Sequence, residues 1–334
     1  MIIVRYKGGL GNQMFQYAFA YALKRKFPDV EITADVTHYQ LHNEHNGFEL
    51  EKCFGIAIPK ADKKTLKEYS PYYVPGKAYS FAPRPIKRYI SRNLQFKYYN
   101  KQLNQLKDNV WYYKQEYHNT YAPDVFEHIG EALKEGKTVY LDGLWQDIRY
   151  FDEYKDDIKE IFSLSDEPSE ENSIGIHIRC GDFLNSKFDI CPPKYYAEAL
   201  DIIKSNTTES NTTESNATES NTSADNPVKS DNADSDDEQV YVFTDDTIKA
   251  VDILGKRGET FKYINSGVQS SLKDMELLSR CSKMIISNST FAFWAAYLGE
   301  PKLVIAPKYS VIKPEQKFEL YTPDEWVVID NGRD

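Results

Sequence analysis

A strand–turn–helix–strand pattern at the start of the chain constrains the fold most. Residues 2–5 form a short, mostly apolar strand, a glycine-rich turn follows at 8–13, and the helix expected from Met14 to Phe27 is stopped by Pro28. A second short strand follows at 31–34. Two strands joined by a helix make a βαβ unit, because the crossover returns the chain to run in the same direction. The pattern therefore predicts a parallel sheet.

The same alternation starts again in the second half of the chain. After the acidic, serine-containing run 163–172, the sequence predicts strands at 174–178, 240–243, 284–286 and 303–305, with helices between them. We expect an α/β fold with two Rossmann-like α/β domains that face a cleft. The N-terminal domain is placed at 1–162, the C-terminal domain at 163–312 and a C-terminal tail at 313–334. Ligands of such folds bind at the carboxyl ends of the parallel strands.

A low-complexity segment at 205–239 interrupts the second domain. It opens with five-residue repeats of the type SNTTE, and it accounts for −8 of the formal net charge of −10 because it holds nine acidic residues and one lysine. It has no aromatic residue and cannot bury enough apolar surface to fold. We predict a disordered insert. The rest of the chain is then nearly neutral, which argues against a nucleic-acid partner.

The sequence lacks the features of a targeting or anchoring segment. The apolar start is too short for a signal peptide, and the longest apolar stretch, 14–23, is far too short to span a membrane. The four cysteines do not have zinc-binding spacing, which favours free thiols in a reducing compartment. These observations predict cytoplasmic localisation.

The region 60–107 is basic and rich in tyrosine, with twelve Lys or Arg against two acidic residues. One interpretation is a solvated helical face with aromatic anchors. The other is a platform for a glycan or for an anionic membrane surface, which would make the protein peripheral at the inner membrane. The sequence leaves both open.

The glycine-rich turn has two interpretations. Gly9 and Gly11, with Asp35 at the end of the second strand, imitate a dinucleotide fingerprint and would suit a nicotinamide-dependent oxidoreductase. Met14 stands at the third glycine position, however, and the Lys-Ser/Thr of a phosphate-binding loop does not follow. A plain tight turn is the alternative.

Polar side chains gather where the strand at 174–178 ends. His177 and Arg179 alternate with the apolar isoleucines and share one face, and Asp182 follows after Gly181. The planar guanidinium of arginine suits phosphate oxygens, and Asp182 could orient either neighbour. A core histidine with a structural Arg–Asp pair is the alternative interpretation.

Two other strand ends carry polar groups. The strand at 284–286 leads into Ser287, Asn288, Ser289 and Thr290 at the start of a helix, where they could cap the helix or present donors to a phosphate. The strand at 240–243 leads to Asp245 and Asp246, which could accept from a ribose or cap a helix. A third acidic ligand at useful spacing is missing, so we expect no metal.

Taken together, these motifs resemble those of the bacterial alpha-1,2-fucosyltransferases, glycosyltransferase family eleven. The matching segments are GGLGNQMFQYAFAYAL (8–23), YLDGLWQDIRYF (140–151), IGIHIRCGDF (174–183), YVFTDD (241–246), SNSTFAFWAAYLG (287–299) and VIAPKYS (304–310). The resemblance implies a GT-B architecture, GDP-beta-L-fucose as donor, a terminal galactose as acceptor and inversion at the fucose carbon. GDP-beta-L-fucose would be a substrate, and we expect no cofactor.

The resemblance also implies roles for single residues. It assigns His177, Arg179 and Asp182 to catalysis, with Arg179 on the diphosphate. The donor-binding residues it implies are Arg179, Asp245, Ser287, Asn288, Ser289 and Thr290, and those lining the acceptor side are Gly11, Asn12 and Gln13. The first domain would then be the acceptor-side domain and the second the GDP-fucose-binding domain. This chain departs from the family in having Cys180 where a second arginine is usual, and Phe183 and Phe293 where tyrosine and tryptophan are usual.

The implied reaction is one displacement, in which a galactose 2-hydroxyl attacks fucose as GDP leaves. Arg179 and the helix start at 288–290 would then stabilise the charge on GDP. His177 and Asp182 are both candidates for the base. Besides the oxidoreductase, a second alternative is a sugar-nucleotide or glycan-binding protein without catalysis, to which Cys180 points.

Overall fold

The computed structural model describes residues 1–41, 46–73, 99, 101–104, 106, 108–115, 121–164, 170–181, 188, 191–214, 238–255, 260–264, 271–313 and 316–331. The chain divides into two compact units. Unit 1 comprises Met1–Ser165, Ser266–Leu272 and Phe318–Tyr321, and unit 2 comprises Asp166–Asn265, Lys273–Lys317 and Thr322–Asp334.

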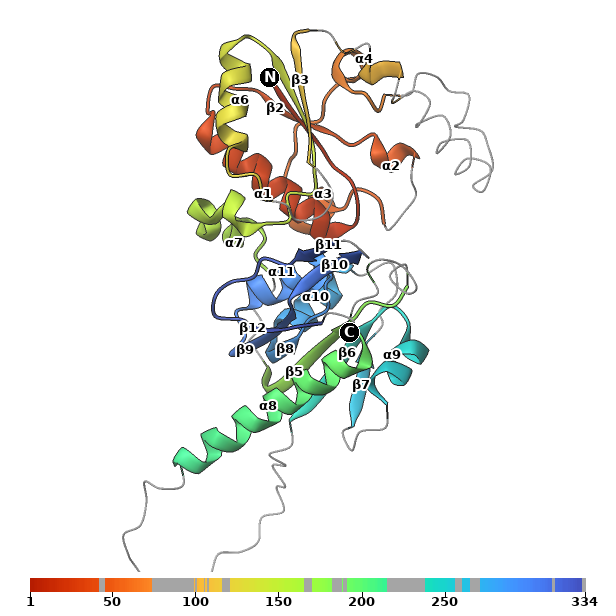
Figure 1. Ribbon diagram of the computed structural model, residues 1–334, viewed down its shortest axis with the longest axis vertical. Helices are drawn as coiled ribbons and strands as arrows, with labels where there is room; N and C mark the ends of the chain where they lie inside the picture. Colours follow the sequence, from red (N-terminus) through yellow and green to blue (C-terminus); the bar gives the residue numbers. More distant parts are fainter. Residues whose placement is uncertain are drawn as a thin grey trace, which may run out of the picture. The chain divides into compact units, whose positions relative to one another are not determined.

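Unit 1 is built on a four-stranded parallel sheet in the order β2-β1-β4-β3. Figure 1 labels β2 and β3 of this sheet. Its strands are β1 (Ile2–Arg5), β2 (Ile32–Asp35), β3 (Val110–Lys114) and β4 (Thr138–Asp142). Its helices are α1 (Leu10–Lys26), α2 (His38–Leu41), α3 (Leu50–Phe54), α4 (Lys63–Tyr69), α6 (Val125–Lys134) and α7 (Lys155–Ile161), with the short 3-10 helices Ile148–Tyr150 and Asp152–Tyr154. The βαβ start of the chain thus forms the parallel pair β1–β2 that the sequence predicts.

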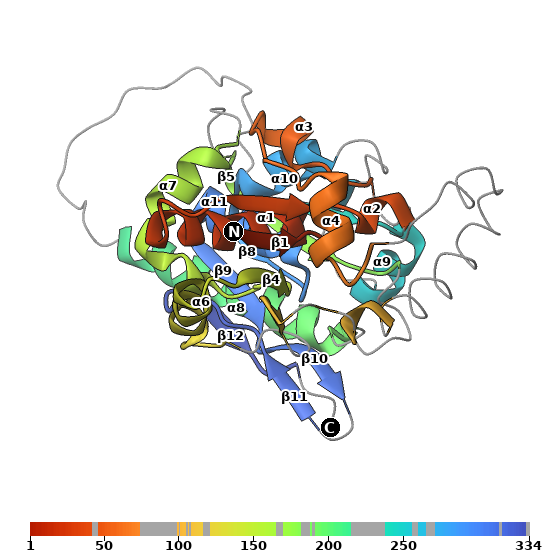
Figure 2. The ribbon, with the colours of Figure 1, turned by 90° about the horizontal axis from the view of Figure 1, so that it is seen from above.

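Unit 2 contains a six-stranded parallel sheet in the order β12-β9-β8-β5-β6-β7. Its strands are β5 (Glu170–Ile178), β6 (Gln239–Thr244), β7 (Phe261–Ile264), β8 (Cys281–Ile285), β9 (Leu303–Pro307) and β12 (Val327–Ile329), and its helices are α8 (Pro193–Glu214), α9 (Thr247–Leu254), α10 (Ser271–Ser279) and α11 (Thr290–Gly299). The strands β10 (Tyr309–Lys313) and β11 (Gln316–Glu319) form a separate two-stranded sheet (Figure 2). The predicted GT-B-like fold class, with two Rossmann-like α/β domains, is confirmed.

The strand order of unit 2 determines where a ligand can bind. The chain passes from β5 outward to β6 and β7 on one side, then returns to β8, β9 and β12 on the other. The strand order therefore reverses between β5 and β8. In doubly wound sheets the loops after such a pair of strands diverge and leave a crevice at the carboxyl edge.

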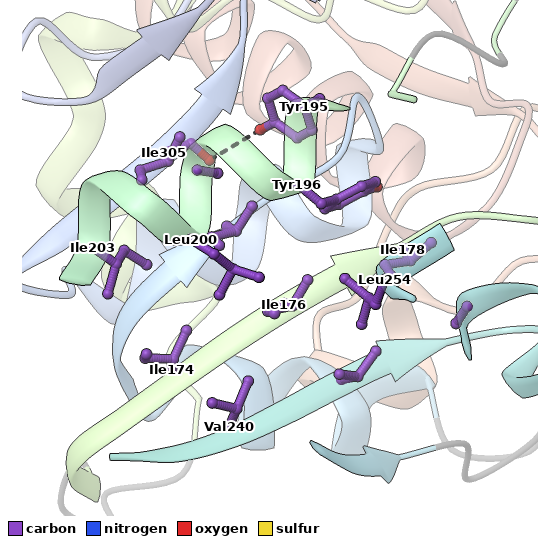
Figure 3. Close-up of a cluster of buried hydrophobic side chains, with 14 of the residues drawn as sticks. Ile174, Ile176, Ile178, Tyr195, Tyr196, Leu200, Ile203, Val240, Leu254 and Ile305 are labelled. Atoms are coloured by element: carbon purple, nitrogen blue, oxygen red, sulfur yellow. Dashed lines mark hydrogen bonds between the residues drawn. The ribbon is translucent and has the colours of Figure 1, made fainter. Parts of the chain in front are cut away.

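The core of unit 2 explains why the strand at β5 forms. Alternation puts Ile174, Ile176 and Ile178 on one face of the strand, where they pack against Leu200 and Ile203 of α8 (Figure 3). All five side chains are at most 3% exposed. Burying each of them contributes roughly 1.5–3 kcal/mol to folding.

The helix α1 starts at Leu10, four residues earlier than predicted. Gly8 provides the turn that makes this possible, because its φ is +83° and a Cβ there would lie 2.3 Å from Asn12 Nδ2. Residues 11–13, expected in the turn, therefore belong to the first turn of α1.

The first residues of the predicted insert, up to Glu214, are the last residues of helix α8. A helix already fixed by its packed first half propagates at little cost through residues that include neither Gly nor Pro. Residues 215–237 of the predicted insert lie outside the described residues. The expected C-terminal tail contributes β12, which pairs with β9.

The basic, tyrosine-rich region 60–107 is only partly described. In that part, Tyr72 packs with Ile3 and Tyr140 on one face of the first sheet, and Tyr69 and Tyr99 pack around them. These side chains behave as the aromatic anchors of the first interpretation, and the membrane interpretation stays a prediction. In the described part of the chain, none of the helices has the length and apolar character needed to cross a bilayer.

Candidate active site

The carboxyl ends of three neighbouring strands bring the predicted donor-site residues of unit 2 together. His177 and Arg179 lie at the end of β5, Asp245 follows β6, and the turn 287–290 follows β8. Because β6, β5 and β8 are adjacent and parallel, these groups share one edge of the sheet. That edge contains the point where the strand order reverses.

A buried hydrogen bond connects the two strands at the reversal. Nδ1 of His177 lies 2.9 Å from Oγ of Ser287. His177 is 6% exposed and Ser287 is 1% exposed. Burial lowers the pKa of His177 to about 3, and the positive charge of Arg179 adds to the effect. The imidazole is therefore neutral at physiological pH.

The two adjacent acidic residues after β6 have different tasks. Asp245 Oδ2 lies 3.0 Å from Nη1 of Arg179, and its Oδ1 accepts a hydrogen bond of 2.8 Å from the backbone N–H of Cys180. Asp246 instead caps α9 by accepting from the backbone N–H of Lys249. Gly181 leaves room for this carboxylate, since a Cβ there would come within 2.5 Å of Asp245 Oδ2 and displace it. Asp245 thus orients Arg179, whose side chain stays 27% exposed.

The polar side chains of the turn before α11 form hydrogen bonds to neighbouring segments of unit 2. Ser289 is the N-cap residue, yet within the described structure its side chain makes no capping hydrogen bond. Ser287 bonds His177, and the Asn288 amide donates to the carbonyls of Ser310 (2.9 Å) and Phe188 (3.1 Å). The polar side chains hold the turn in place, so the backbone N–H groups that begin α11 point out of a fixed loop, as an anion site requires.

Two tyrosines of α8 support this edge, and the sequence analysis missed them. The hydroxyl of Tyr195 donates to the carbonyl of Ile286 at 2.6 Å and also approaches that of Ile305 at 3.3 Å (Figure 3). The hydroxyl of Tyr196 donates to the carbonyl of His177 at 3.4 Å. One helix thereby holds the backbone on both sides of the His177–Ser287 bond. In the sequence the pair reads as ordinary apolar core.

Cys180, where the family usually has a second arginine, points into the core. Its side chain is fully buried in the cluster that contains Ile178 and Tyr196. Only its backbone N–H serves the site, through Asp245. Burial raises the pKa of the Cys180 thiol to about 11, so the thiol stays protonated and unreactive at neutral pH.

The three residues expected on the acceptor side of unit 1 differ in accessibility. Gly11 is buried, and Asn12 is partly exposed and accepts a hydrogen bond from the Gln146 side chain. Gln13 is fully buried, donates to the carbonyls of Gly8 and Gly47, and accepts from the backbone N–H of Glu49. In this structure Gln13 holds the neighbouring loops together. Asp182 and Phe183 lie outside the described residues.

The geometry of Asp35 argues against the dinucleotide interpretation. Its carboxylate is fully buried. Oδ1 accepts from the backbone N–H and the hydroxyl of Thr37, and Oδ2 accepts from the hydroxyls of Ser70 and Tyr140. A ribose could not reach either oxygen without displacing these donors, so Asp35 does not serve as the acid of a nicotinamide site.

Comparison with known proteins identifies the family. The sequence profile described as "Glycosyl transferase family 11" matches residues 1–215 and 235–330. The chain belongs to glycosyltransferase family 11. This confirms the resemblance to the alpha-1,2-fucosyltransferases of that family, and it confirms that the protein is a glycosyltransferase. The family match leaves out residues 216–234, which lie within the predicted insert.

Two of the relatives of this family 11 enzyme are named for different activities. It is 26% identical over 355 residues to an alpha-1,2-colitosyltransferase of Escherichia coli, covering 99% of each chain. It is 23% identical over 347 residues to the galactoside 2-alpha-L-fucosyltransferase Sec1 of Mus musculus, covering 98% of this chain and 74% of the other. An Arabidopsis thaliana FUT1 variant in complex with GDP overlaps 95% of this chain and 73% of its own at 13% identity, with a TM-score of 0.43.

Proposed function

We propose that the enzyme transfers L-fucose from GDP-beta-L-fucose to the 2-hydroxyl of a terminal galactose, with inversion at the fucose carbon. Membership of family 11 supports the class of reaction. The observation that carries the donor assignment is the pairing of a held guanidinium, Arg179, with the amino end of α11 where the strand order of unit 2 reverses.

The donor's diphosphate is assigned to this edge on electrostatic grounds. As the bond between fucose C1 and the phosphate oxygen breaks, negative charge accumulates on the leaving GDP. Arg179 and the backbone N–H groups at the start of α11 are fixed donors that would stabilise that charge. Asp245 keeps the guanidinium in place, and together with the strand ends it is our candidate for the nucleoside side.

The attacking hydroxyl loses a proton to some base, and the structure makes His177 a poor candidate. Its Nδ1 is engaged with Ser287, its ring is buried, and its pKa near 3 leaves it a weak base. We assign His177 a positioning role, in which it fixes Ser287 and the turn that leads into α11. Asp182 is then the remaining sequence candidate for the base.

A transfer assay tests the proposed function. Purified enzyme is incubated with GDP-fucose and lactose, and the product is analysed by mass spectrometry and by NMR for its linkage. We expect one fucose on O2 of galactose with α configuration. A parallel reaction with GDP-colitose tests the sugar named by the Escherichia coli relative. If lactose stays unmodified while GDP binds, the assigned acceptor is contradicted, and preferential transfer of colitose would contradict the assigned donor.

A further inference from the structure

The four parallel strands of unit 1 all end in a charged residue, and the signs alternate along the sheet edge. In sheet order, the last residues of the strands are Asp35, Arg5, Asp142 and Lys114. Arg5 is in register with Asp35, and Lys114 is in register with Asp142. Val4 is in register with Leu141, so Arg5 comes next to Asp142. We call this set the charged edge.

The two carboxylates of the charged edge are fully supplied with donors. Asp35 accepts only from neutral groups, as described above. Asp142, which is 1% exposed, lies 3.2 Å from Nη1 of Arg5 and 2.7 Å from Nζ of Lys7, and it also accepts from the Tyr72 hydroxyl. Two cations therefore share one carboxylate. Both lysines remain accessible, since the Lys7 side chain is 25% exposed and Lys114 is exposed.

The charges at this edge do not balance. The alternating set is neutral by itself, and Lys7 adds one positive charge to it. Burial lowers the pKa of Lys7, Asp142 opposes this, and the nearby cations Arg5 and Lys114 lower it further. A partly buried site with excess positive charge is stabilised by an anion. The location is also one where parallel sheets bind ligands, because Arg5 and Asp142 are the last residues of β1 and β4 and Lys7 follows β1, which places all three at the carboxyl edge of the sheet.

We infer that the charged edge binds an anionic group, a carboxylate or a phosphate, carried by the acceptor saccharide, through Lys7 and Lys114. This inference rests on the proposed function, in which unit 2 already supplies Arg179 and the start of α11 for the diphosphate of the donor. A second cationic site on the other unit is then available to the other substrate. Asp142 is the positioning residue that holds the Lys7 ammonium, and Arg5 in turn holds Asp142.

Matched acceptors test the inference. Lactitol and lactobionate both present a terminal galactose and differ only in a CH₂OH or a carboxylate at the far end of the open chain, while lactose 1-phosphate supplies the phosphate arm against lactose. For the unmodified enzyme at low salt, we expect kcat/KM to be about 3–10-fold higher for the anionic member of at least one pair, as for a partly exposed charge pair. The pair with the larger difference shows whether the site prefers a carboxylate or a phosphate. The difference in kcat/KM should become smaller as the salt concentration is raised.

Substitutions connect this preference to the charged edge. Lys7→Met should bring the ratio of anionic to neutral acceptor close to 1, and Lys7→Arg should retain part of it. Lys7→Met removes one of the two cations that pair with the buried Asp142 and can therefore destabilise the fold. Lys114→Met leaves both pairs intact and should also lower the ratio. Lys134→Met, on the exposed side of α6, is the matched control and should keep the ratio of the unmodified enzyme.

Each alternative outcome contradicts the inference in a recognisable way. Equal kcat/KM within both pairs for the unmodified enzyme overturns it, while transfer to lactose still upholds the proposed function. A Lys7→Met enzyme that raises the KM for GDP-fucose and keeps the acceptor ratio would assign this lysine to the donor. Failure to transfer fucose to any of the four acceptors counts against the proposed function itself.

Discussion

Nδ1 of His177 and Oγ of Ser287 are 2.9 Å apart and join the ends of β5 and β8 where the strand order of unit 2 reverses. The bond closes the base of the crevice expected at that point. It also determines where the next residues lie, because Arg179 follows two positions after His177 and the start of α11 follows three positions after Ser287. The groups assigned to the diphosphate are thus fixed from both sides.

Arg179 offers the most direct test of the donor site. Arg179→Ala should lower kcat by on the order of 10²–10³, because a fixed donor to the leaving group is lost. Arg179→Lys should restore only part of this, since an ammonium lacks the planar fork. Arg280→Ala, which removes an arginine next to β8 that pairs with Glu170, is the matched control and should retain turnover. A folded Arg179→Ala enzyme with normal turnover would refute the assigned role.

The neutral His177 predicts a dependence of stability on pH. Its pKa is about 3 in the folded chain against 6.5 for an ordinary histidine, so below pH 6.5 only the unfolded chain takes up the proton. The free energy of unfolding should therefore be fully retained above pH 6.5 and fall by up to about 1.4 kcal/mol per pH unit below it. Chemical denaturation at several pH values measures this.

Substitution separates the contribution of His177 from that of other groups. His177→Gln should flatten the decline between pH 6.5 and pH 4, whereas His128→Gln, at an exposed position of α6, should leave its slope as in the unmodified enzyme. If the slope is the same in all three proteins, His177 is not the buried neutral histidine described above.

Tyr195 predicts a positioning effect on the donor site. Tyr195→Phe removes the hydroxyl that holds the Ile286 carbonyl, at a cost of about 1 kcal/mol in stability. Because the turn into α11 follows directly, we expect kcat/KM for GDP-fucose to fall on the order of 10-fold, with the KM for lactose little changed. Tyr263→Phe, from the same core cluster, is the control. Equal effects on both substrates, or none beyond stability, would leave Tyr195 as ordinary core.

Removal of residues 216–234 should leave transfer intact. The family match leaves these residues out and covers the chain before and after them, at 1–215 and 235–330. Steady-state kinetics of the shortened enzyme with GDP-fucose and lactose should agree with the full chain within about 2-fold, which is smaller than the effect of losing a typical hydrogen bond. A large loss of turnover would show that the segment takes part in catalysis.

The sequence predicted those features that depend on short stretches of chain. The alternation of Ile174, Ile176 and Ile178 was enough to predict the second half of β5, which begins at Glu170, and the strand-end rule was enough to place Arg179, Asp245 and Ser287 just after strands. The early start of α1 was missed because the pair Gly8-Gly9 indicates a turn but does not show that a helix begins directly after it, at Leu10.

Features that depend on distant partners could not be read from the sequence. The charged edge exists because four strands far apart in the chain end in register, and each end alone is one ordinary charged residue. Tyr195 is similar, since its partner carbonyl is 91 positions away. Gln13 shows the reverse case. Its sequence position suggests a ligand-binding residue, but its side-chain amide forms hydrogen bonds with backbone groups of Gly8, Gly47 and Glu49.

The pentapeptide repeats at 205–224 begin in the last turns of α8 and continue into the connection to β6, and this position has an evolutionary consequence. The connection starts after α8 and ends where β6 begins, so both of its anchor points lie on the amino side of the sheet, away from the strand ends that carry Arg179 and Ser287. DNA encoding short tandem repeats gains and loses units readily during replication. At this place such changes of length meet little selection from catalysis, so strains bearing the same enzyme should differ in how many pentapeptides they carry.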